Sequence, residues 1–429
     1  MRFPAFSVLL ALIMGLLLTS CSSTDAEDIS FMVFGDPAEL AAYEALVEAF
    51  EESNTEISIS LQHVPSQGDY RQRLAAGFSG GEPPDIMLIN YRRFGTFASQ
   101  GGLVPLTDYL ENSEVISAKE FFPVALESFQ WNGELWCIPQ NISSLVVYYN
   151  RDLFDEAGIP YPEADWRWSD FLETARLLTS DNDGDDRPDF YGVGITPSVF
   201  RLAPFIWQNG GRLVDDRNNP TRLTLDETAS LDAFQWFVDL QEKEQVAPDA
   251  AAEAAEGSQS RFLNGTMGMI LNSRRGVPTY RTIDTFEWDV APLPQGRRPA
   301  GILHSDGFCM ASATENKNAA WKFIEFANSE IGQQIVVRSG RTVPSLISVA
   351  ESEAFLDTTL APESSQVFID VIPVLETVPT MSTWIAIEET VSKEIERAFY
   401  GEVSVYDAVL AAIERTRDYF ERDTLSRSP

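Results

Sequence analysis

Apolar runs alternate with amphipathic stretches along the first part of the chain. Apolar or alternating runs of strand length lie at 29–34, 57–61 and 84–89, and stretches with helical spacing lie at 39–52 and 70–78. A regular succession of strand, helix and strand is typical of an open parallel sheet covered by helices. The pattern therefore predicts an α/β fold.

The same mixture of strand and helix patterns continues to the C-terminus. Strand-like runs lie at 145–149 and 307–311, and helical spacing recurs at 168–178, 231–242, 318–328, 388–400 and 405–422. About 400 residues follow the N-terminal leader, which is more than one hydrophobic core usually serves. We therefore expect two domains.

The N-terminus has the pattern of an export signal. Arg2 precedes an apolar run over 8–18, which is too short to span a bilayer and is followed by small residues and Cys21. This predicts a lipoprotein signal peptide over 1–20, with Cys21 as the lipid-attachment residue; an ordinary secretory signal with an incidental cysteine is the alternative. Residues 21–28 are small and polar, as in a flexible tether. We expect an extracytoplasmic protein, lipid-anchored to the periplasmic or outer face of the cell membrane.

Charge and cysteine content narrow the class of protein further. The formal net charge of −34 disfavours binding to nucleic acid or to an anionic membrane surface, so the lipid anchor is the only membrane contact expected. Beyond Cys21 only Cys137 and Cys309 remain, which excludes a disulfide framework and leaves a single bridge open. No cofactor is expected.

Short motifs occur in a characteristic order over nearly the whole chain. They are Gly35-Asp36, Pro84-Asp85-Ile86, Arg93-Phe94, Gly102-Leu103-Val104-Pro105-Leu106, Ile138-Pro139, the run from Tyr148 to Phe154, Trp168-Ser169-Asp170-Phe171, Trp207-Gln208-Asn209-Gly210-Gly211, the run from Phe262 to Met269, and Ala320-Trp321-Lys322-Phe323. Together with the lipoprotein signal, this order resembles the extracellular solute-binding protein family 1, the sugar-binding lipoproteins of ABC importers, of which maltose-binding protein is a distant relative.

The resemblance implies a type II periplasmic-binding-protein-like fold, in which two α/β lobes enclose a ligand cleft. Each lobe is then discontinuous: 29–140 with 301–345 forms the N-terminal lobe, and 141–300 with 346–429 forms the C-terminal lobe. The resemblance also implies a monomer that closes on a sugar or polyol and delivers it to the transmembrane subunits of an ABC permease. Ligand is expected at the carboxyl ends of the strands, where the lobes face each other.

Polar residues follow two expected strands of the N-terminal lobe. Asp36 comes directly after the first strand, where it would accept sugar hydroxyls or, alternatively, cap a helix before Pro37. Tyr91, Arg92 and Arg93 follow the third strand and offer donors and an aromatic plate; the alternative is a solvated basic turn. All four are candidate ligand residues.

Three candidates belong to the C-terminal lobe. Trp207, like Phe200, would either stack on a sugar or belong to the core. Asn272 and Arg275 follow an apolar strand, and Arg275 matches a position where maltose-binding relatives carry a stacking tryptophan. That departure weakens a malto-oligosaccharide assignment, because an arginine suits a charged or more polar sugar.

Two further candidates lie late in the chain. Asp306 precedes a strand near the expected second crossing and would either bind ligand or form a turn. Trp384 stands in Met381-Ser382-Thr383-Trp384, which resembles the late aromatic contribution of the family to the cleft. It is the strongest stacking candidate.

An acidic segment has the spacing of a calcium loop. Asp181, Asp183, Asp185 and Asp189 occupy the first, third, fifth and ninth positions of an EF-type loop. The sixth position is not glycine, however, and the twelfth is not glutamate. The sequence leaves both a structural calcium site and a solvated acidic turn open.

An exported carbohydrate-active enzyme and a non-transport surface receptor are the alternative functions. Residues 77–81 satisfy the G-x-S-x-G pattern, but a helical stretch precedes them where a nucleophile elbow needs a strand. The only two histidines, His63 and His304, form no zinc-protease motif. We therefore expect no enzymatic activity, whereas a surface receptor would share both the fold and the site of a transport receptor.

Overall fold

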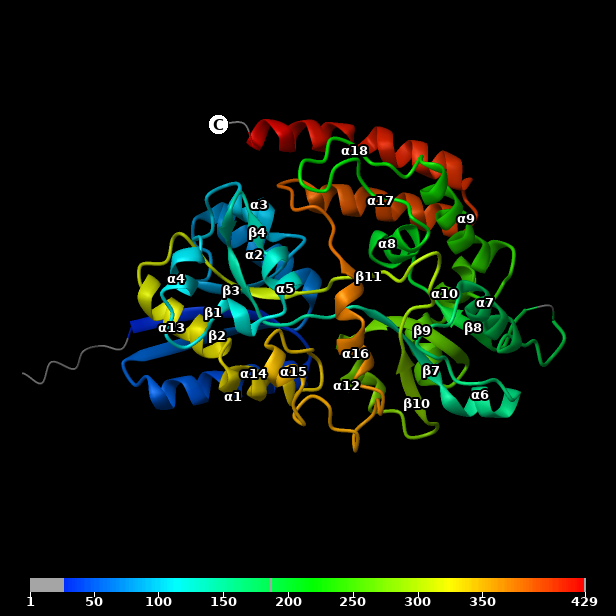
Figure 1. The fold of residues 1–429 in the computed structure, drawn as a ribbon, viewed down its shortest axis with the longest axis horizontal. Coiled ribbons are helices and arrows are strands. Elements are labelled where there is room, and N and C mark those ends of the chain that lie inside the picture. The colour runs from blue at the N-terminus through cyan, green and yellow to red at the C-terminus, as the bar shows by residue number, and fades with distance from the viewer. Residues whose placement is uncertain (1–26, 186, 428–429) are drawn as a thin grey trace, which may run out of the picture.

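The protein consists of two α/β lobes joined by several chain crossings in a computed structural model that describes residues 27–185 and 187–427 (Figure 1). This architecture agrees with the predicted fold class. The expected signal peptide, Cys21 and the tether up to residue 26 lie outside the described residues. The first strand begins at Glu27, inside the segment that the sequence analysis assigns to the tether.

The first lobe is built on a five-stranded sheet of order β2-β1-β3-β12-β6. Its strands are β1 (Glu27–Phe34), β2 (Ile57–Val64), β3 (Ile86–Asn90), β6 (Cys137–Pro139) and β12 (Asp306–Met310). β1 pairs in parallel with β2 and β3, as expected, whereas β12 lies antiparallel between β3 and β6. The sheet is therefore mixed, which corrects the expectation of a purely parallel sheet.

Helices surround this sheet, and its strands β1 and β3 are accordingly buried along most of their length. The helices are α1 (Pro37–Ser53), α2 (Gln67–Gly80), α3 (Phe94–Ala98), α4 (Thr107–Glu111), η1 (Ala118–Glu120), α5 (Pro123–Ser128), α13 (Lys317–Ala327), α14 (Glu330–Val337) and α15 (Ile347–Ala350), and a small hairpin joins β4 (Gln130–Trp131) to β5 (Glu134–Leu135). In the core, the Phe31 ring contacts Tyr43 of α1, Phe308 of β12 and Phe323 of α13.

The second lobe is built on a four-stranded sheet of order β10-β7-β9-β8. Its strands are β7 (Leu145–Asn150), β8 (Tyr191–Gly194), β9 (Met267–Ser273) and β10 (Trp288–Ala291). Its helices are α6 (Arg151–Ala157), α7 (Trp168–Leu177), α8 (Val199–Gln208), α9 (Thr228–Glu242), α10 (Ala250–Ala255), α11 (Ser258–Leu263), η2 (Arg274–Gly276) and α12 (Val277–Tyr280). The Tyr148 ring anchors this core against Tyr280 and Trp288, at centroid distances of 4.7 and 5.7 Å.

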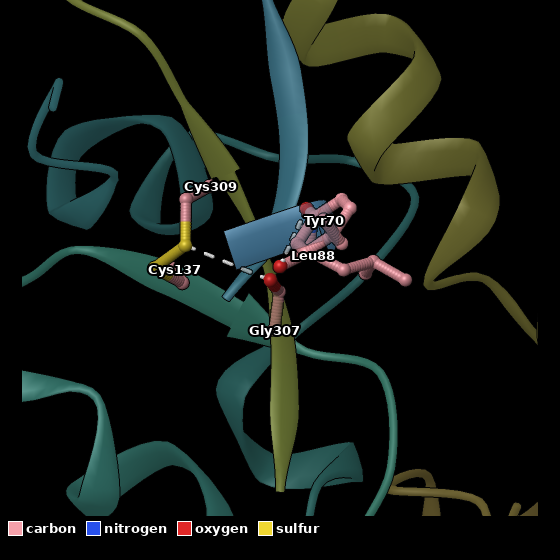
Figure 2. Close-up of a disulfide and its surroundings, with 5 residues drawn as sticks. All are labelled: Tyr70, Leu88, Cys137, Gly307 and Cys309. Atoms are coloured by element: carbon pink, nitrogen blue, oxygen red, sulfur yellow. Dashed lines mark hydrogen bonds between the residues drawn. A yellow bond between two sulfur atoms is a disulfide. The ribbon is translucent and has the colours of Figure 1, made fainter. Parts of the chain in front are cut away.

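A disulfide joins two neighbouring strands of the first lobe (Figure 2). Cys137 of β6 lies directly opposite Cys309 of β12 in the ladder, and both side chains are fully buried. This settles the pairing that the cysteine spacing left open. The same figure shows Tyr70 of α2 against β3, where its hydroxyl donates to the Leu88 carbonyl at 2.8 Å.

Three segments lie side by side where the two lobes meet. Asn141 forms a β-bridge with Pro344, and Ser143 forms one with His304 through two N–H···O bonds of 2.8 Å. A fourth passage follows β11 (Gly301–Ile302) and its parallel partner β13 (Leu375–Glu376), with α16 (Val367–Asp370) and η3 (Ile372–Val374) before β13. Beyond Ser345, α15 packs against α14 of the first lobe, and the boundary at 345 stays a prediction.

The C-terminal helices α17 (Trp384–Phe399) and α18 (Val405–Arg427) pack on each other and on α9 of the second lobe. α17 also contacts α3 of the first lobe. In Figure 1, α18 runs along the top of the view above both lobes. Among the described residues, no helix combines the length and the apolar character that crossing a membrane requires.

Candidate ligand-binding cleft

The cleft lies where β1 and β3 end and where the second lobe faces them. Phe34 ends β1, Phe200 stands near the start of α8, and Arg275 belongs to η2. The Arg275 guanidinium lies 5.1 Å from the centroid of the Phe34 ring. The guanidinium of Arg92, which follows β3, lies 5.0 Å from the centroid of Phe200. The lobes therefore touch across the cleft.

A cavity of about 390 Å³ lies between the first lobe and α17. We call it the main cavity, because it lies at the ends of β1 and β3 in the cleft. Its aromatic lining residues are Phe34, Tyr70, Phe78 and Phe97, and its charged and amide lining residues include Arg71, Asn90, Arg93, Asp306 and Glu389. The rings of Phe78 and Phe97 pack at a centroid distance of 4.6 Å. The volume is in the range of small-molecule binding sites.

A much smaller space of about 20 Å³ lies at the chain crossings. Its lining residues include Glu39, Asn141, Ser143, Arg275, His304 and Arg341. This volume holds little more than one water molecule. Phe34 and Asp306 line both spaces, so the main cavity adjoins the crossings.

Asp36 caps a helix and pairs with an arginine. Its carboxylate accepts hydrogen bonds from the backbone N–H groups of Ala38 and Glu39 at 3.0 Å, which satisfies free donors at the start of α1. The same carboxylate pairs with Arg341, which precedes the bridge at Pro344. The structure thus places Asp36 at the edge of the cleft in the capping role that was the alternative interpretation of the sequence.

Glu39 is a buried carboxyl group with an imperfect partner. It is 7 % exposed, and its Oε2 lies 2.7 Å from Nε of Arg341 without the alignment of a hydrogen bond. Burial raises the pKa of Glu39 to about 7, although Arg341 and Arg275 act to lower this pKa. Ionised Glu39 therefore costs the folded state free energy.

Replacing Glu39 by glutamine is expected to stabilise the protein more at pH 8 than at pH 5. From the ordinary pKa of 4.5 up to about 7, the folded state retains a proton that the unfolded chain has lost, so stability falls as pH rises through this window. The full penalty, at most about 3 kcal/mol, is present above the folded-state pKa. Urea unfolding of parent and variant at both pH values measures the difference.

The matched control is Glu44→Gln, since Glu44 is exposed on the same helix. Its effect on the free energy of unfolding should be the same at both pH values. An equal effect of Glu39→Gln at pH 5 and pH 8 would contradict the raised pKa.

Arg92 and Arg93 lie in a charged network that spans the cleft. Arg92 pairs with Glu388 of α17 at 2.8 Å and donates to Oδ1 of Asn90 at 3.0 Å. Asn90 in turn donates to Asp306 at 3.0 Å. Arg93 lines the main cavity, and its closest carboxylate contact is Glu388 at 3.9 Å. The loop after β3 thus connects the first lobe to α17 through ion pairs.

His304 sits at the crossings between the charged groups of both lobes. Loss of water around the ring lowers the pKa of His304 to about 4, although Asp306 acts to raise it. Arg92, Arg275 and Arg71 add to the lowering. His304 is therefore neutral at neutral pH.

Three aromatic candidates are buried and line neither of these two spaces, so their role as ligand residues stays a prediction. Tyr91 is 1 % exposed, and its hydroxyl accepts from the N–H of Val378. Trp207 is 5 % exposed and lies about 10 Å farther along α8 than Phe200, because each helical residue adds about 1.5 Å. Trp384 is 1 % exposed and donates through Nε1 to Glu388 at 3.2 Å.

Of the candidates Asn272 and Arg275, one contacts its own lobe and the other reaches the cleft. Asn272 donates to the Tyr280 hydroxyl at 2.8 Å and lines neither space. Arg275 reaches the first lobe at Phe34. Only Arg275 of the two therefore faces the cleft.

Several residues of the main cavity are missing from the sequence-based candidates: Phe34, Tyr70, Arg71, Phe78, Phe97, Ile385 and Glu389. Phe34 had a usable signal, since it precedes Gly35-Asp36 at the end of a predicted strand. The residues on α2, α3 and α17 had none, because their meeting depends on how helices distant in the chain pack together.

Three of the four expected calcium ligands come together in the acidic segment. Carboxylate oxygens of Asp181, Asp183 and Asp189 lie within 4.8 Å of one another on the surface, and Asp185 lies outside this group. Backbone N–H groups already use some of these oxygens: Gly184 donates to Asp181 at 2.7 Å, and Asn182 donates to Asp189 at 2.8 Å. Calcium binding stays a prediction.

The G-x-S-x-G segment lies at the end of α2, and Gly81 ends that helix in a left-handed conformation. Because helix rather than strand precedes Ser79, the segment lacks the geometry of a nucleophile elbow.

The chain is similar to proteins of known description over most of its length. A binding protein of Brucella abortus is 25 % identical over 402 residues, which are 92 % of this chain and 93 % of that protein. The arabinooligosaccharide-binding protein of Halalkalibacterium halodurans is 27 % identical over 340 residues, covering 72 % of this chain and 69 % of its own. An ABC substrate-binding protein of Listeria monocytogenes, solved in complex with cycloalternan, superposes with a TM-score of 0.84 at 23 % identity, covering 92 % of this chain and 100 % of that chain.

A family model described as bacterial extracellular solute-binding protein matches residues 35–334. This match spans most of the chain and includes strands of both lobes. The protein belongs to the bacterial extracellular solute-binding protein family.

Proposed function

We propose that this protein is the receptor of an ABC importer and that it binds a carbohydrate in the main cavity. The observation that carries the proposal is the composition of that cavity: aromatic rings and polar side chains line one space of about 390 Å³ between the first lobe and α17. The arabinooligosaccharide-binding relative and the cycloalternan complex support a carbohydrate ligand.

The chemistry of a sugar fits such a lining. A pyranose has apolar C–H faces, which pack on aromatic rings, and a rim of hydroxyl groups, which need donors and acceptors. Phe78 and Phe97 provide partly exposed rings, while Asn90, Arg93 and Asp306 provide hydrogen-bonding groups. These side chains bind and orient the ligand without altering it.

Lobe closure is the proposed response to ligand. The contacts of Arg275 with Phe34 and of Arg92 with Glu388 join the lobes, and the bridged crossings provide the hinge. Ligand shifts the equilibrium toward the closed form only as far as it binds that form more tightly. The permease would then distinguish loaded from empty receptor by the joined lobe surfaces.

The N-terminal signal supports attachment of a monomeric receptor to the membrane by lipid at Cys21. The transmembrane subunits of the permease are the proposed protein partner. Palmitate labelling of cells that express parent or Cys21→Ala tests the anchor: label on the parent alone is expected, and equal labelling would contradict it.

A thermal-shift screen against mono- and oligosaccharides tests the proposed function. A ligand that binds only the folded protein raises the melting temperature in proportion to the logarithm of its concentration over Kd. We expect at least one saccharide to raise the melting temperature and to be recovered unchanged after incubation. Release of a cleaved product would instead favour the exported enzyme.

With a binding saccharide in hand, Phe97→Leu is expected to weaken its affinity roughly 3- to 10-fold, because a lost aromatic contact is worth about 0.5–1.5 kcal/mol. Phe326→Leu on α13 is the matched control, since its ring packs on Phe50 away from the cavity. Calorimetric titration measures both. Equal affinities of the two variants would place the ligand elsewhere.

Transport separates an importer receptor from a surface receptor with the same site. Saturable, energy-dependent uptake of the bound sugar should disappear when the protein is deleted and return with the intact chain. Unchanged uptake would favour the surface receptor.

A further inference from the structure

Six arginines lie around the cleft, although the chain as a whole is strongly acidic. The chain has 65 acidic residues against 31 lysines and arginines. The six arginines at the cleft are Arg71, Arg92, Arg93, Arg201, Arg275 and Arg341, and the five neighbouring carboxylates are Asp36, Glu39, Asp306, Glu388 and Glu389. Basic and acidic groups are thus nearly balanced at the cleft, whereas in the chain as a whole acidic groups outnumber basic ones about two to one.

Two of these arginines have protein partners that account for their charge. Arg341 pairs with Asp36 and Glu39, and Arg92 pairs with Glu388. These contacts occupy three of the five carboxylates.

Within the described residues, the other four arginines have no carboxylate at hydrogen-bonding distance, and the contact of Arg93 with Glu388 is long, at 3.9 Å. Within residues 27–185 and 187–427, the side chains of Arg71, Arg93, Arg201 and Arg275 donate no hydrogen bond to a protein acceptor, and the nearest carboxylate of Arg93 already pairs with Arg92. Nε of Arg93 and Nε of Arg201 are buried without a hydrogen-bond partner. Such buried donors cost free energy unless an acceptor meets them.

Burial acts on the charge of all four groups. Loss of water lowers the pKa of Arg71 and of Arg201 to about 10, and it also lowers the pKa of Arg93 and of Arg275. The positive charge of Arg93 adds to the lowered pKa of Arg71, although Glu388 and Asp306 act to raise this pKa. A negatively charged group bound close to these arginines would favour their charged forms.

Arg71 and Arg93 share the main cavity with its aromatic residues. Arg71 lies on α2 between Tyr70 and Phe78, and Arg93 lies in the loop after β3 next to α3 and Phe97. Of the two carboxylates on this cavity, Asp306 accepts from Asn90, and Glu389 is exposed at the α17 side. The cavity therefore offers aromatic rings and two guanidinium groups to the same ligand.

We propose that the ligand is a saccharide or polyol carrying an anionic group, a carboxylate or a phosphate ester, which Arg71 and Arg93 bind inside the main cavity. This inference rests on the proposed function, because it names the class of sugar for the same site. A guanidinium presents paired donors that match the two oxygens of a carboxylate or phosphate. The aromatic residues bind the uncharged part of the molecule.

Calorimetric titration with matched pairs tests the inference on the purified full-length protein. The probes are galacturonate, glucuronate and their disaccharides, glucose 6-phosphate and glycerol 3-phosphate, each beside its neutral counterpart. The acidic member of the binding pair should bind about 10- to 100-fold more tightly, as expected for hydrogen bonds to a charged group. Tighter binding of the uronates would identify a carboxylate ligand, and tighter binding of the phosphate esters would identify a phosphate ligand.

Variants connect the preference to the two arginines. Arg71→Gln and Arg93→Gln should each remove most of the preference for the acidic member, because each variant weakens binding of the acidic member much more than binding of the neutral one. Arg73→Gln is the matched control, because Arg73 is exposed on the same helix and carries the same charge. Its preference should equal that of the parent.

The outcomes separate the two proposals. If a neutral sugar binds as tightly as its acidic counterpart, the anionic ligand is overturned while carbohydrate binding stands. If Arg73→Gln reduces the preference as much as the cavity variants, general charge explains the preference and the assigned residues are wrong. If neither member of any pair binds, the proposed carbohydrate function itself fails.

Discussion

Replacing Trp384 by alanine is expected to lower the free energy of unfolding by about 3–5 kcal/mol, the usual cost of truncating a buried tryptophan. Trp384 is 1 % exposed and begins α17 beside Met381, another buried residue. The cavity left by the ring would remain partly unfilled, since protein interiors relax incompletely around such a loss. Urea unfolding of parent and variant measures the change.

Trp384→Phe serves as the matched control, because it keeps an aromatic ring in the core and loses the hydrogen bond to Glu388. The loss of unfolding free energy in Trp384→Phe should be less than half of the loss in Trp384→Ala. If Trp384→Ala instead kept full stability and lost sugar binding, the ring would belong to the ligand, as the sequence motif suggested.

Removing the disulfide by Cys137→Ala with Cys309→Ala is expected to cost a comparable amount. The bridge closes a loop whose ends are 172 residues apart. Freeing so long a loop in the unfolded chain costs up to about 5 kcal/mol in the chain-entropy model, and measured losses are typically about 2–5 kcal/mol. The melting temperature and the urea midpoint should both fall.

Reducing agent provides an internal control for this prediction. Urea unfolding of the parent in dithiothreitol should approach that of the double variant, while the variant itself should not respond. A parent that unfolds identically with and without reductant, under conditions where thiol labelling confirms reduction, would contradict a stabilising bridge.

Much of the fold could be predicted from the sequence, because the periodicities of strands and helices depend only on residues close together in the chain. The runs at 29–34 and 84–89 became β1 and β3, and the stretch at 39–52 lies inside α1. The position of β12 between β3 and β6 could not be predicted from local patterns, because its antiparallel pairing with β3 joins residues more than 200 positions apart. Such pairings depend on the packing of the complete lobe.

The site was harder to predict than the fold because it depends on the rotation of single helices. The motif at Trp384 identified the correct helix start, but Ile385 and Glu389 face the main cavity while Trp384 enters the core. Adjacent residues of a helix point about 100° apart, so an error of one position changes the side of the helix. Strand ends were only partly informative: Arg93 after β3 and Asp306 at the start of β12 line the cavity, whereas Tyr91 after β3 does not.

The position of β12 in the chain also constrains the order in which the protein can mature. Every strand of the second sheet precedes β12 in sequence, yet β12 separates β3 from β6 in the first sheet. While the polypeptide emerges in N-to-C order during secretion, β6 therefore has no neighbour to pair with until roughly the first 310 residues have crossed the membrane. Until β12 is available, β3 has an unpaired edge in the first sheet. An unpaired strand edge promotes aggregation, so the nascent chain is at risk until the strands of the second sheet and β12 have followed.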